Sequence, residues 1–380
     1  MTSLIHYHGL PLEQAQGDMP RALRLLADLW DKQCSFRALQ QSPWIIPLEG
    51  HHYIECSTGG SSGAAKIIRR HWDSWQQSFR VNQSHFNLCA NDRYAVFGEL
   101  NHSLALYATC ESIASGLAVE VLSRMRPRSQ RARLIESGVT VLYITPTQLR
   151  LLITAGGPCP LVRLILCGGS KLDDRLREQT KLSFPNARIH EFYGASETSF
   201  ITLSDSDTPP GSVGKAYPGV DIVIKNISQQ VGEVWLKSPY LFERYAQGSS
   251  DETRYCAGYI TVGEMGRLDS SGNLWLYGRK SRMVTSADSN VYPERVEALI
   301  AQLTGALCAV VARPDRLRGW VLWAYIQGPL SDGQEQSLRL AIRQQLGSIM
   351  EPKKFFGLTC FPQLPSGKPD LQKLEAGARL

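Results

Sequence analysis

Apolar and polar positions follow two different patterns along the middle of the chain. Short apolar runs, rich in β-branched and aromatic residues, occupy positions 94–98, 141–144, 162–167 and 188–192. Helical patterns lie between some of them, near 103–116 and 172–183. Strands that alternate with helices in this way form parallel βαβ units. The pattern therefore predicts an α/β fold over roughly residues 94–193.

The pattern changes after Pro209-Pro210-Gly211. Short strands separated by turns are expected at 221–225, 231–237 and 273–277, which indicates a small β-rich subdomain over 211–280. Beyond residue 280 we expect helices near 293–303 and 332–347 and strands near 307–312 and 320–326. Residues 281–380 are therefore predicted to form a small α+β domain, separate from a large domain over 1–280.

Composition agrees with this division, because 380 residues exceed what one ordinary core accommodates. The content of 43% hydrophobic and 20% charged residues is typical of a globular protein in water. We expect no membrane span and a cytoplasmic location, since no uncharged apolar stretch approaches the roughly 18 residues that a span needs. Nine scattered cysteines without a C-x-x-C pair favour reduced thiols over disulfides or a zinc site.

The formal net charge is +6, and the densest basic stretch spans residues 124–133. It lacks interleaved aromatic residues and any known reader motif, so we expect no nucleic-acid partner. Two readings remain for this stretch. It is either a solvated helix start or a patch for an acidic protein.

The segment 57–66, Ser-Thr-Gly-Gly-Ser-Ser-Gly-Ala-Ala-Lys, carries the clearest chemical signal. Glycines let the backbone N–H groups approach an anion, hydroxyls add donors, and a lysine adds a positive charge. A phosphate chain is the expected ligand. The segment is not a Walker P-loop, because two alanines separate Gly63 from Lys66. A flexible Gly/Ser loop is the alternative interpretation.

Two further loops follow predicted strands, Gly168-Gly169-Ser170 and Tyr193-Gly194. Ligands of open α/β sheets bind beyond the carboxyl ends of the strands. Both loops are therefore candidate walls of a binding site, although Gly168-Gly169-Ser170 also suits a simple strand-to-helix turn.

The glycine-rich segment is the first of eight motifs that follow one another along the chain. The others lie at 191–197 (Glu-Phe-Tyr-Gly-Ala-Ser-Glu), 211–214, 232–236, 258–266, 278–279, 290–297 and 365–368 (Pro-Ser-Gly-Lys). In order and spacing this series resembles the adenylate-forming (AMP-binding) superfamily of acyl- and aryl-CoA synthetases, peptide-synthetase adenylation domains and luciferases. The resemblance covers about residues 50–373 and is strongest to short acyl-CoA synthetases.

The resemblance implies a large amino-terminal domain of parallel βαβ layers and a small, mobile carboxy-terminal domain. It implies a ligase that activates an acyl or aryl acid with ATP and Mg²⁺ to an acyl-AMP, releases pyrophosphate, and passes the acyl group to the thiol of CoA, as in fatty acid metabolism. The phosphopantetheine of an acyl carrier protein is the alternative acceptor. A nucleotide-binding interaction protein without catalysis is the alternative of another class.

Site roles also follow from the resemblance. The β- and γ-phosphates are assigned to Ser57, Thr58, Gly59, Gly60, Ser61, Ser62, Gly63 and Lys66. The adenine is assigned to Gly168, Gly169, Ser170, Tyr193 and Gly194, and the ribose to Glu264 and Arg279. The catalytic residues are Ser196 on the α-phosphate, Glu197 on Mg²⁺, and Lys368 between the substrate carboxylate and the α-phosphate. His102 corresponds to an acyl-pocket histidine, although a helix-start histidine explains it nearly as well, and Ser281 lies at the hinge.

Three features depart from the family pattern. Ala65 replaces the usual proline of the glycine-rich segment. Ser281 replaces an aspartate or lysine at the hinge, and Ala287 and Asp288 stand in a loop that usually carries glycine, which makes the thiol-transfer step less secure than adenylation. Only 56 residues precede the glycine-rich segment. The shortened amino-terminal part, 1–56, leaves room for a partner chain to cover a sheet edge and part of the acyl pocket.

Overall fold

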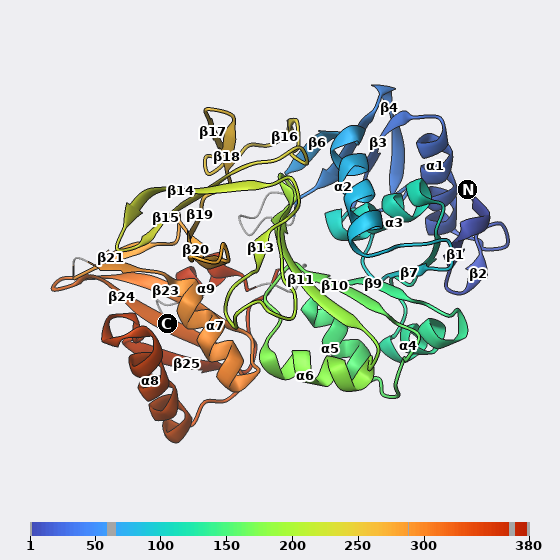
Figure 1. Cartoon of the computed structure of the whole chain (residues 1–380). Coiled ribbons are helices and arrows are strands. Elements are labelled where there is room, and N and C mark those ends of the chain that lie inside the picture. The colour runs from blue at the N-terminus through green and yellow to red at the C-terminus, as the bar shows by residue number, and fades with distance from the viewer. Residues whose placement is uncertain (1, 59–65, 288, 365–368, 378–380) are drawn as a thin grey trace.

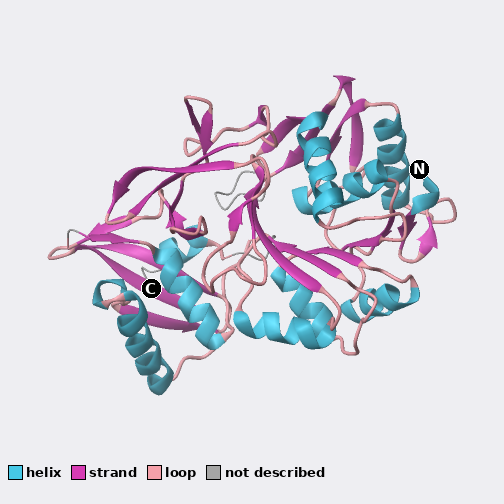
Figure 2. Ribbon diagram, in the orientation of Figure 1, coloured by secondary structure: helices cyan, strands magenta, loops and turns pink. Residues whose placement is uncertain are grey.

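The computed structural model describes residues 2–58, 66–287, 289–364 and 369–377. The amino-terminal elements lie at one side of the molecule and α7 (Pro293–Thr304) and α8 (Asp332–Leu346) at the other (Figure 1). The described residues form a central sheet and four smaller sheets, and Figure 2 shows helices on both faces of the central sheet.

The central sheet has nine strands in the order β13-β12-β11-β10-β9-β7-β8-β1-β2 among the described residues. Strands β7 to β11 pair in parallel, as in Leu164 with Val141 and Arg188. The mixed α/β fold predicted from the sequence is confirmed. The bounds are β1 Ile5–Tyr7, β2 Leu10–Pro11, β7 Arg93–Val96, β8 Ala118–Val121, β9 Val141–Ile144, β10 Leu164–Gly168, β11 Arg188–Ala195, β12 Ser199–Leu203 and β13 Lys215–Ala216.

Alternate residues of these strands enter two different cores, because successive side chains of a strand point to opposite faces. Val141 and Tyr143 pack on the side of α3, whereas Leu142 and Ile144 pack on the side of α4, α5 and α6. Both faces are buried, which explains the continuous apolar runs in the sequence. The covering helices are α3 Ser103–Ser115, α4 Pro127–Glu136, α5 Pro146–Thr154 and α6 Asp174–Ser183.

The amino-terminal part contributes to two sheets. Strand β1 pairs in parallel with β8 of the central sheet, and β3, β4 and β5 belong to a second sheet in the order β16-β6-β5-β3-β4. Glu55 is buried in this sheet between Arg37 and Arg69, whose guanidinium groups compensate its charge. The bounds are α1 Asp18–Asp31, β3 Cys34–Ala38, β4 Ile45–His51, β5 Tyr53–Ser57, β6 Ile67–His71, α2 Trp72–His85 and β16 Arg244–Gln247, with a short 3₁₀ helix at Thr2–Leu4.

The third sheet contains most of the segment 211–280. Its strands are β14 Asp221–Ser228, β15 Val231–Lys237, β17 Arg254–Cys256, β18 Tyr259–Thr261, β19 Glu264–Leu268 and β20 Leu274–Arg279. Val231 and Met265 of this sheet share an apolar cluster with Val296 and Ile300 of α7. The carboxy-terminal segment is therefore packed against the third sheet in this structure.

The carboxy-terminal segment contains a hairpin, a three-stranded sheet and helices. The bounds are β21 Val284–Ser286, β22 Ser289–Val291, β23 Cys308–Asp315, β24 Gly319–Gln327, β25 Lys354–Leu358, a 3₁₀ helix at Ser348–Met350, and α9 Leu371–Gly377. All nine cysteines are free thiols, and five of them are buried. In the described parts of the chain, no helix has the length and apolar character that crossing a membrane requires.

Candidate functional site

The ends of the glycine-rich segment are fixed by a β-hairpin. Strands β5 and β6 pair up to Ser57 and Ile67, and the Thr58 N–H donates to the Lys66 carbonyl oxygen at 2.9 Å. Ser57 also forms a β-bridge with His102, the residue that precedes α3. The described base of the hairpin therefore lies beside the amino-terminus of α3. Gly59, Gly60, Ser61, Ser62 and Gly63 lie outside the described residues, as do Ala65 and Lys368.

Ser196 and Glu197 lie in the turn that joins β11 to the antiparallel β12. The Ser196 hydroxyl is 2.9 Å from the hydroxyl of Ser103 in the first turn of α3. The Glu197 carboxylate accepts a hydrogen bond from the Tyr245 hydroxyl at 2.8 Å. These contacts hold both side chains at the junction of the central sheet, α3 and the second sheet.

Lys66 links the hairpin to this turn. Its ammonium group lies 5.8 Å from the centre of the Tyr245 ring, within range of a cation–π interaction. Because Tyr245 also donates to Glu197, a single tyrosine contacts both the lysine and the carboxylate. The structure thus brings together the described ends of the glycine-rich segment, His102, Ser196 and Glu197.

The predicted adenine wall lies at the carboxyl ends of two neighbouring strands. Gly168, the last residue of β10, pairs with Phe192 of β11, directly before Tyr193. A Cβ atom on Gly168 would lie 2.3 Å from the Phe192 ring, so any larger residue would require that ring to shift. Gly169 has φ +95°, in the left-handed region that favours glycine, and Ser170 is exposed. The loop and Tyr193 are therefore adjacent. Tyr193 and Gly194 do not form the expected loop after residue 192, because β11 continues to Ala195 and both residues pair with β12.

The predicted ribose pair, Glu264 and Arg279, faces across the β19–β20 ladder. Arg279 Nε is 3.5 Å from a Glu264 carboxylate oxygen, and its Nη1 is 3.1 Å from Glu252. Burial alone would lower the pKa of Arg279, but the Glu264 and Glu252 carboxylates raise it above its ordinary value. Burial raises the pKa of the Tyr193 hydroxyl well above its ordinary value, and the Glu264 charge adds to this effect. Tyr193, Glu264 and Arg279 therefore share one electrostatic environment.

Ser281, the predicted hinge residue, is exposed in a turn between two anchored arginines. Arg279 contacts the third sheet as described, and Arg282 forms a paired hydrogen bond with Glu297 of α7 at 2.6 and 3.1 Å. In the following β21–β22 hairpin, Ala287 has φ +44°, a conformation that costs an alanine more than a glycine. Asp288 lies outside the described residues.

The side chains at the turn with Ser196 and Glu197 would hold a cation only if a bound ligand supplied further oxygen atoms. Within the described ranges, no group of three or more His, Cys, Asp or Glu side chains could hold a metal ion. A Mg²⁺ ion at Glu197 would take its other oxygen ligands from phosphates and water, which is the usual arrangement for this ion with nucleotides.

Several residues of the site were not predicted from the sequence. Ser103 directly follows His102, and its helix-start position was the available signal. Arg70 donates to the Ser196 carbonyl oxygen. It follows the alternation of β6, which places it on the same buried face as Ile68. Tyr245 and Glu252 reach the site from distant segments, and nothing in their local sequence indicates this.

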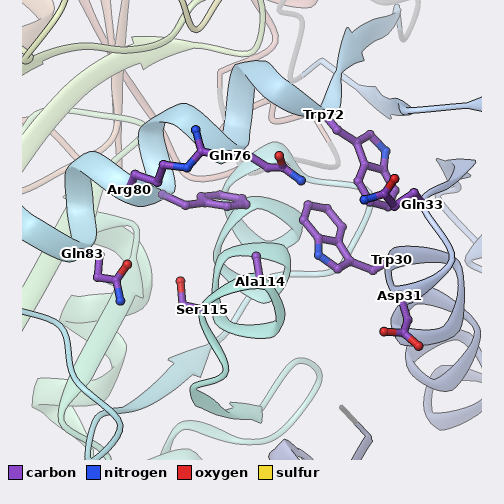
Figure 3. Close-up of a pocket in the computed structure, with 10 residues that line it drawn as sticks. Trp30, Asp31, Gln33, Trp72, Gln76, Arg80, Gln83, Ala114 and Ser115 are labelled. Carbon is purple, nitrogen blue, oxygen red and sulfur yellow. The ribbon is translucent and has the colours of Figure 1, made fainter.

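A groove of about 440 Å³ lies apart from the predicted site residues, none of which lines it. It runs between α1, α2 and the end of α3, with Arg80 and Gln83 towards one end and Asp31 and Gln33 towards the other (Figure 3). The rings of Trp30 and Trp72 stack along its wall at 4.2 Å. The groove is a feature of the amino-terminal elements and not of the candidate nucleotide site.

This fold and this arrangement of side chains suit a nucleotide-dependent enzyme, and the family comparison agrees. Residues 36–246, more than half of the chain, match the family model described as AMP-binding enzyme, and the chain belongs to that family.

Individual relatives are acyl-CoA ligases by name. The chain is 29% identical over 328 residues to the uncharacterized acyl–CoA ligase YhfT of Bacillus subtilis, covering 84% of this chain and 67% of the relative. It is 31% identical over 252 residues to the putative long chain fatty acid-CoA ligase VraA of Staphylococcus epidermidis, covering 65% and 54%. The chain thus spans between about half and two thirds of the length of these curated relatives.

A solved structure shares the fold over most of the chain. It is the O-succinylbenzoate coenzyme A synthetase MenE from Bacillus subtilis in complex with ATP and magnesium ion. The match has a TM-score of 0.75 at 25% identity and covers 85% of this chain and 69% of that structure.

Proposed function

We propose that this protein is an adenylate-forming ligase that activates a small acyl or aryl acid with ATP and Mg²⁺ and transfers the acyl group to the thiol of CoA. The observation that carries the proposal is the junction of the β5–β6 hairpin, the turn with Ser196 and Glu197, and the amino-terminus of α3. Tyr193, Glu264 and Arg279 lie on the adjoining strands, where a nucleoside attached to the same phosphates would sit.

The proposed chemistry has two steps. A carboxylate oxygen attacks the α-phosphorus and pyrophosphate leaves; then the thiol sulfur attacks the acyl carbon, and AMP leaves while the thiol proton is lost. Both partners of the first step are anions, so catalysis consists of alignment and charge neutralisation. We assign the β- and γ-phosphates to the glycine-rich segment with Lys66, the α-phosphate to Ser196, and Mg²⁺ to Glu197. Bound Mg²⁺ would neutralise phosphate charge.

We assign the bridging role in the first step to Lys368, on a mobile domain formed by residues 281–380 that turns about Ser281. The adenine is assigned to Gly168, Gly169, Ser170 and Tyr193, and the acyl pocket to His102. The cytoplasm is the proposed location, since nine free thiols suit a reducing compartment.

The names of the relatives support CoA as the acceptor. An acyl carrier protein is the second candidate, favoured by the exposed Arg126 and Arg128 at the start of α4, which suit an acidic partner.

The test is acid-dependent exchange of labelled pyrophosphate into ATP over a panel of carboxylic acids, followed by mass analysis of products with CoA and with a carrier protein. We expect Lys368→Ala to slow exchange by about a hundred- to a thousandfold while ATP binding persists, because a preorganised cation stabilises the developing charge. The matched control is Lys373→Ala on α9, whose side chain is 70% exposed. If no acid supports exchange and both variants bind ATP like the wild type, the non-catalytic alternative is favoured.

A further inference from the structure

Arg70 is a buried cation beneath the candidate site. It is 1% exposed and lies on β6, the strand that leads out of the glycine-rich segment. None of the ion pairs among the described residues includes it. Burying an arginine that forms no ion pair is costly, and an apolar side chain would serve stability better. Stability alone therefore does not explain why an arginine occupies this position.

The guanidinium of Arg70 holds backbone and hydroxyl groups from several elements. Nη2 donates to the Ser196 carbonyl oxygen at 2.5 Å. Nη1 donates to the Tyr240 carbonyl oxygen at 3.1 Å and to the Ser74 hydroxyl of α2 at 3.0 Å. Its central carbon lies 5.0 Å from the centre of the Trp75 ring. Arg70 thus connects the strand after the glycine-rich segment directly to the turn that contains Ser196 and Glu197.

The charge of Arg70 persists at neutral pH. Burial lowers its pKa to about 10, and the nearby Cys56 thiol, Glu197 and Tyr107 oppose the shift. A fixed cation under a turn that receives phosphates needs no reorganisation when charge develops there.

Arg131 shows that burial of an arginine is not by itself a sign of function. It is 3% exposed, donates to the carbonyl oxygens of Leu152 and Ser183, and lies 4.6 Å from the centre of the Phe184 ring. Its contacts are all with helices and loops of the α4–α6 layer. What distinguishes Arg70 is the bond to Ser196.

We propose that Arg70 is a positioning residue for adenylation. Through the Ser196 carbonyl oxygen it fixes the turn, so that the Ser196 hydroxyl and the Glu197 carboxylate keep their orientation when the triphosphate binds. It also makes this orientation depend on the strand that follows the glycine-rich segment. The inference rests on the proposed function.

The experiment compares Arg70→Gln, Arg70→Lys and the matched Arg131→Gln in the full-length protein. Both glutamine variants should lower the melting temperature, because both lose buried hydrogen bonds. Only Arg70→Gln should lower the kcat of pyrophosphate exchange, by about a hundredfold, with a smaller change in the KM for ATP. Arg131→Gln should retain kcat within about threefold once the folded fraction is taken into account.

The dependence of kcat on pH distinguishes positioning by a cation from a purely structural effect of Arg70. In Arg70→Lys, we expect partial recovery of kcat at pH 7 that is lost as pH rises, because burial lowers the pKa of a lysine into this range. The wild-type profile should show no such loss. Equal kcat losses for Arg70→Gln and Arg131→Gln, in proportion to their unfolding, would overturn the proposal.

Failure of the proposed function is visible separately, as absence of exchange in the wild type with every acid. In that case the affinity for Mg·ATP, measured by calorimetry, tests whether Arg70 positions the turn with Ser196 and Glu197. Positioning predicts at least tenfold weaker binding for Arg70→Gln than for Arg131→Gln, and equal affinities contradict it.

Discussion

Glu111 is a single carboxyl group enclosed completely by the core between α3 and the central sheet. Its oxygens accept hydrogen bonds from the Tyr143 hydroxyl, from the Tyr94 hydroxyl at 3.1 Å and from the Asn82 amide at 2.7 Å. Burial raises its pKa from 4.5 to about 7, and the hydrogen bonds only partly oppose this. The folded protein therefore binds a proton at a pH where the unfolded chain has released it.

This shift gives a pH dependence of stability with a definite sign. A folded pKa above the unfolded pKa means that the contribution is fully present below pH 4.5 and is lost as pH rises through about 7. The difference corresponds to about 3 kcal/mol of unfolding free energy. We expect Glu111→Gln to remove most of this dependence in denaturant titrations between pH 4.5 and 8.

The control is Glu136→Gln on α4, whose side chain is 58% exposed, and it should leave the wild-type pH dependence in place. If the wild type and Glu111→Gln lose stability in parallel between pH 4.5 and 8, a group other than Glu111 causes the pH dependence.

At the scale of the element, the β11–β12 hairpin depends on one glycine. The two strands approach so closely that a Cβ atom on Gly194 would lie 2.0 Å from the Ser199 carbonyl oxygen. Because this contact is with backbone, the hairpin itself would have to move, and the turn with Ser196 and Glu197 would move with it.

We therefore expect Gly194→Ala to destabilise the protein by about 1–3 kcal/mol and to weaken Mg·ATP binding beyond what unfolding explains. Denaturant unfolding and calorimetry measure the two effects. Gly333→Ala in α8 is the matched control, since nothing lies within 4 Å of its added Cβ and its helical position favours alanine. Unchanged ATP affinity in Gly194→Ala would mean that the turn is not part of the nucleotide site.

The elements that were predictable from the sequence are those with strong local patterns. The predicted strand at 141–144 and the helix near 172–183 match β9 and α6 closely, since a buried parallel strand is apolar throughout and a capped helix has clear ends. The second sheet was not predicted. Its edge strand β16 pairs with β6 from far along the chain, so local patterns carry no information about the pairing.

In the site, too, the residues within local motifs were predictable from the sequence, whereas residues brought in from distant segments were not. Gly168 and Tyr193 were expected near one site because each follows a predicted strand, and the two strands are neighbours in the sheet. Glu197 was assigned from the family resemblance. Tyr245, which contacts Glu197, comes from β16, so only the three-dimensional pairing brings it there. Arg70 was missed because the charge of an arginine argues for exposure, although its alternation with Ile68 indicates a buried face.

At the scale of the whole molecule, the net charge of +6 can attract an acidic partner only where cations remain unpaired on the surface. In the stretch 124–133, Arg124 pairs with Glu99, Arg133 pairs with Glu136, and Arg131 is buried. Arg126 and Arg128 are exposed at the start of α4 and appear in none of the ion pairs of the described residues. We expect an acidic carrier protein to be attracted to these two arginines and transfer to the small CoA molecule not to depend on them.

Reversing both charges, in Arg126→Glu/Arg128→Glu, distinguishes the two acceptors. If a carrier protein is the acceptor, kcat/KM for transfer to it should fall by about tenfold at low salt, and the difference should vanish near 0.5 M salt, because exposed charges are then screened. Transfer to CoA should stay within about twofold of the wild type. Arg21→Glu/Lys32→Glu on and beside α1 makes the same change of net charge elsewhere, and a similar loss in that variant would show that net charge rather than this surface governs the encounter.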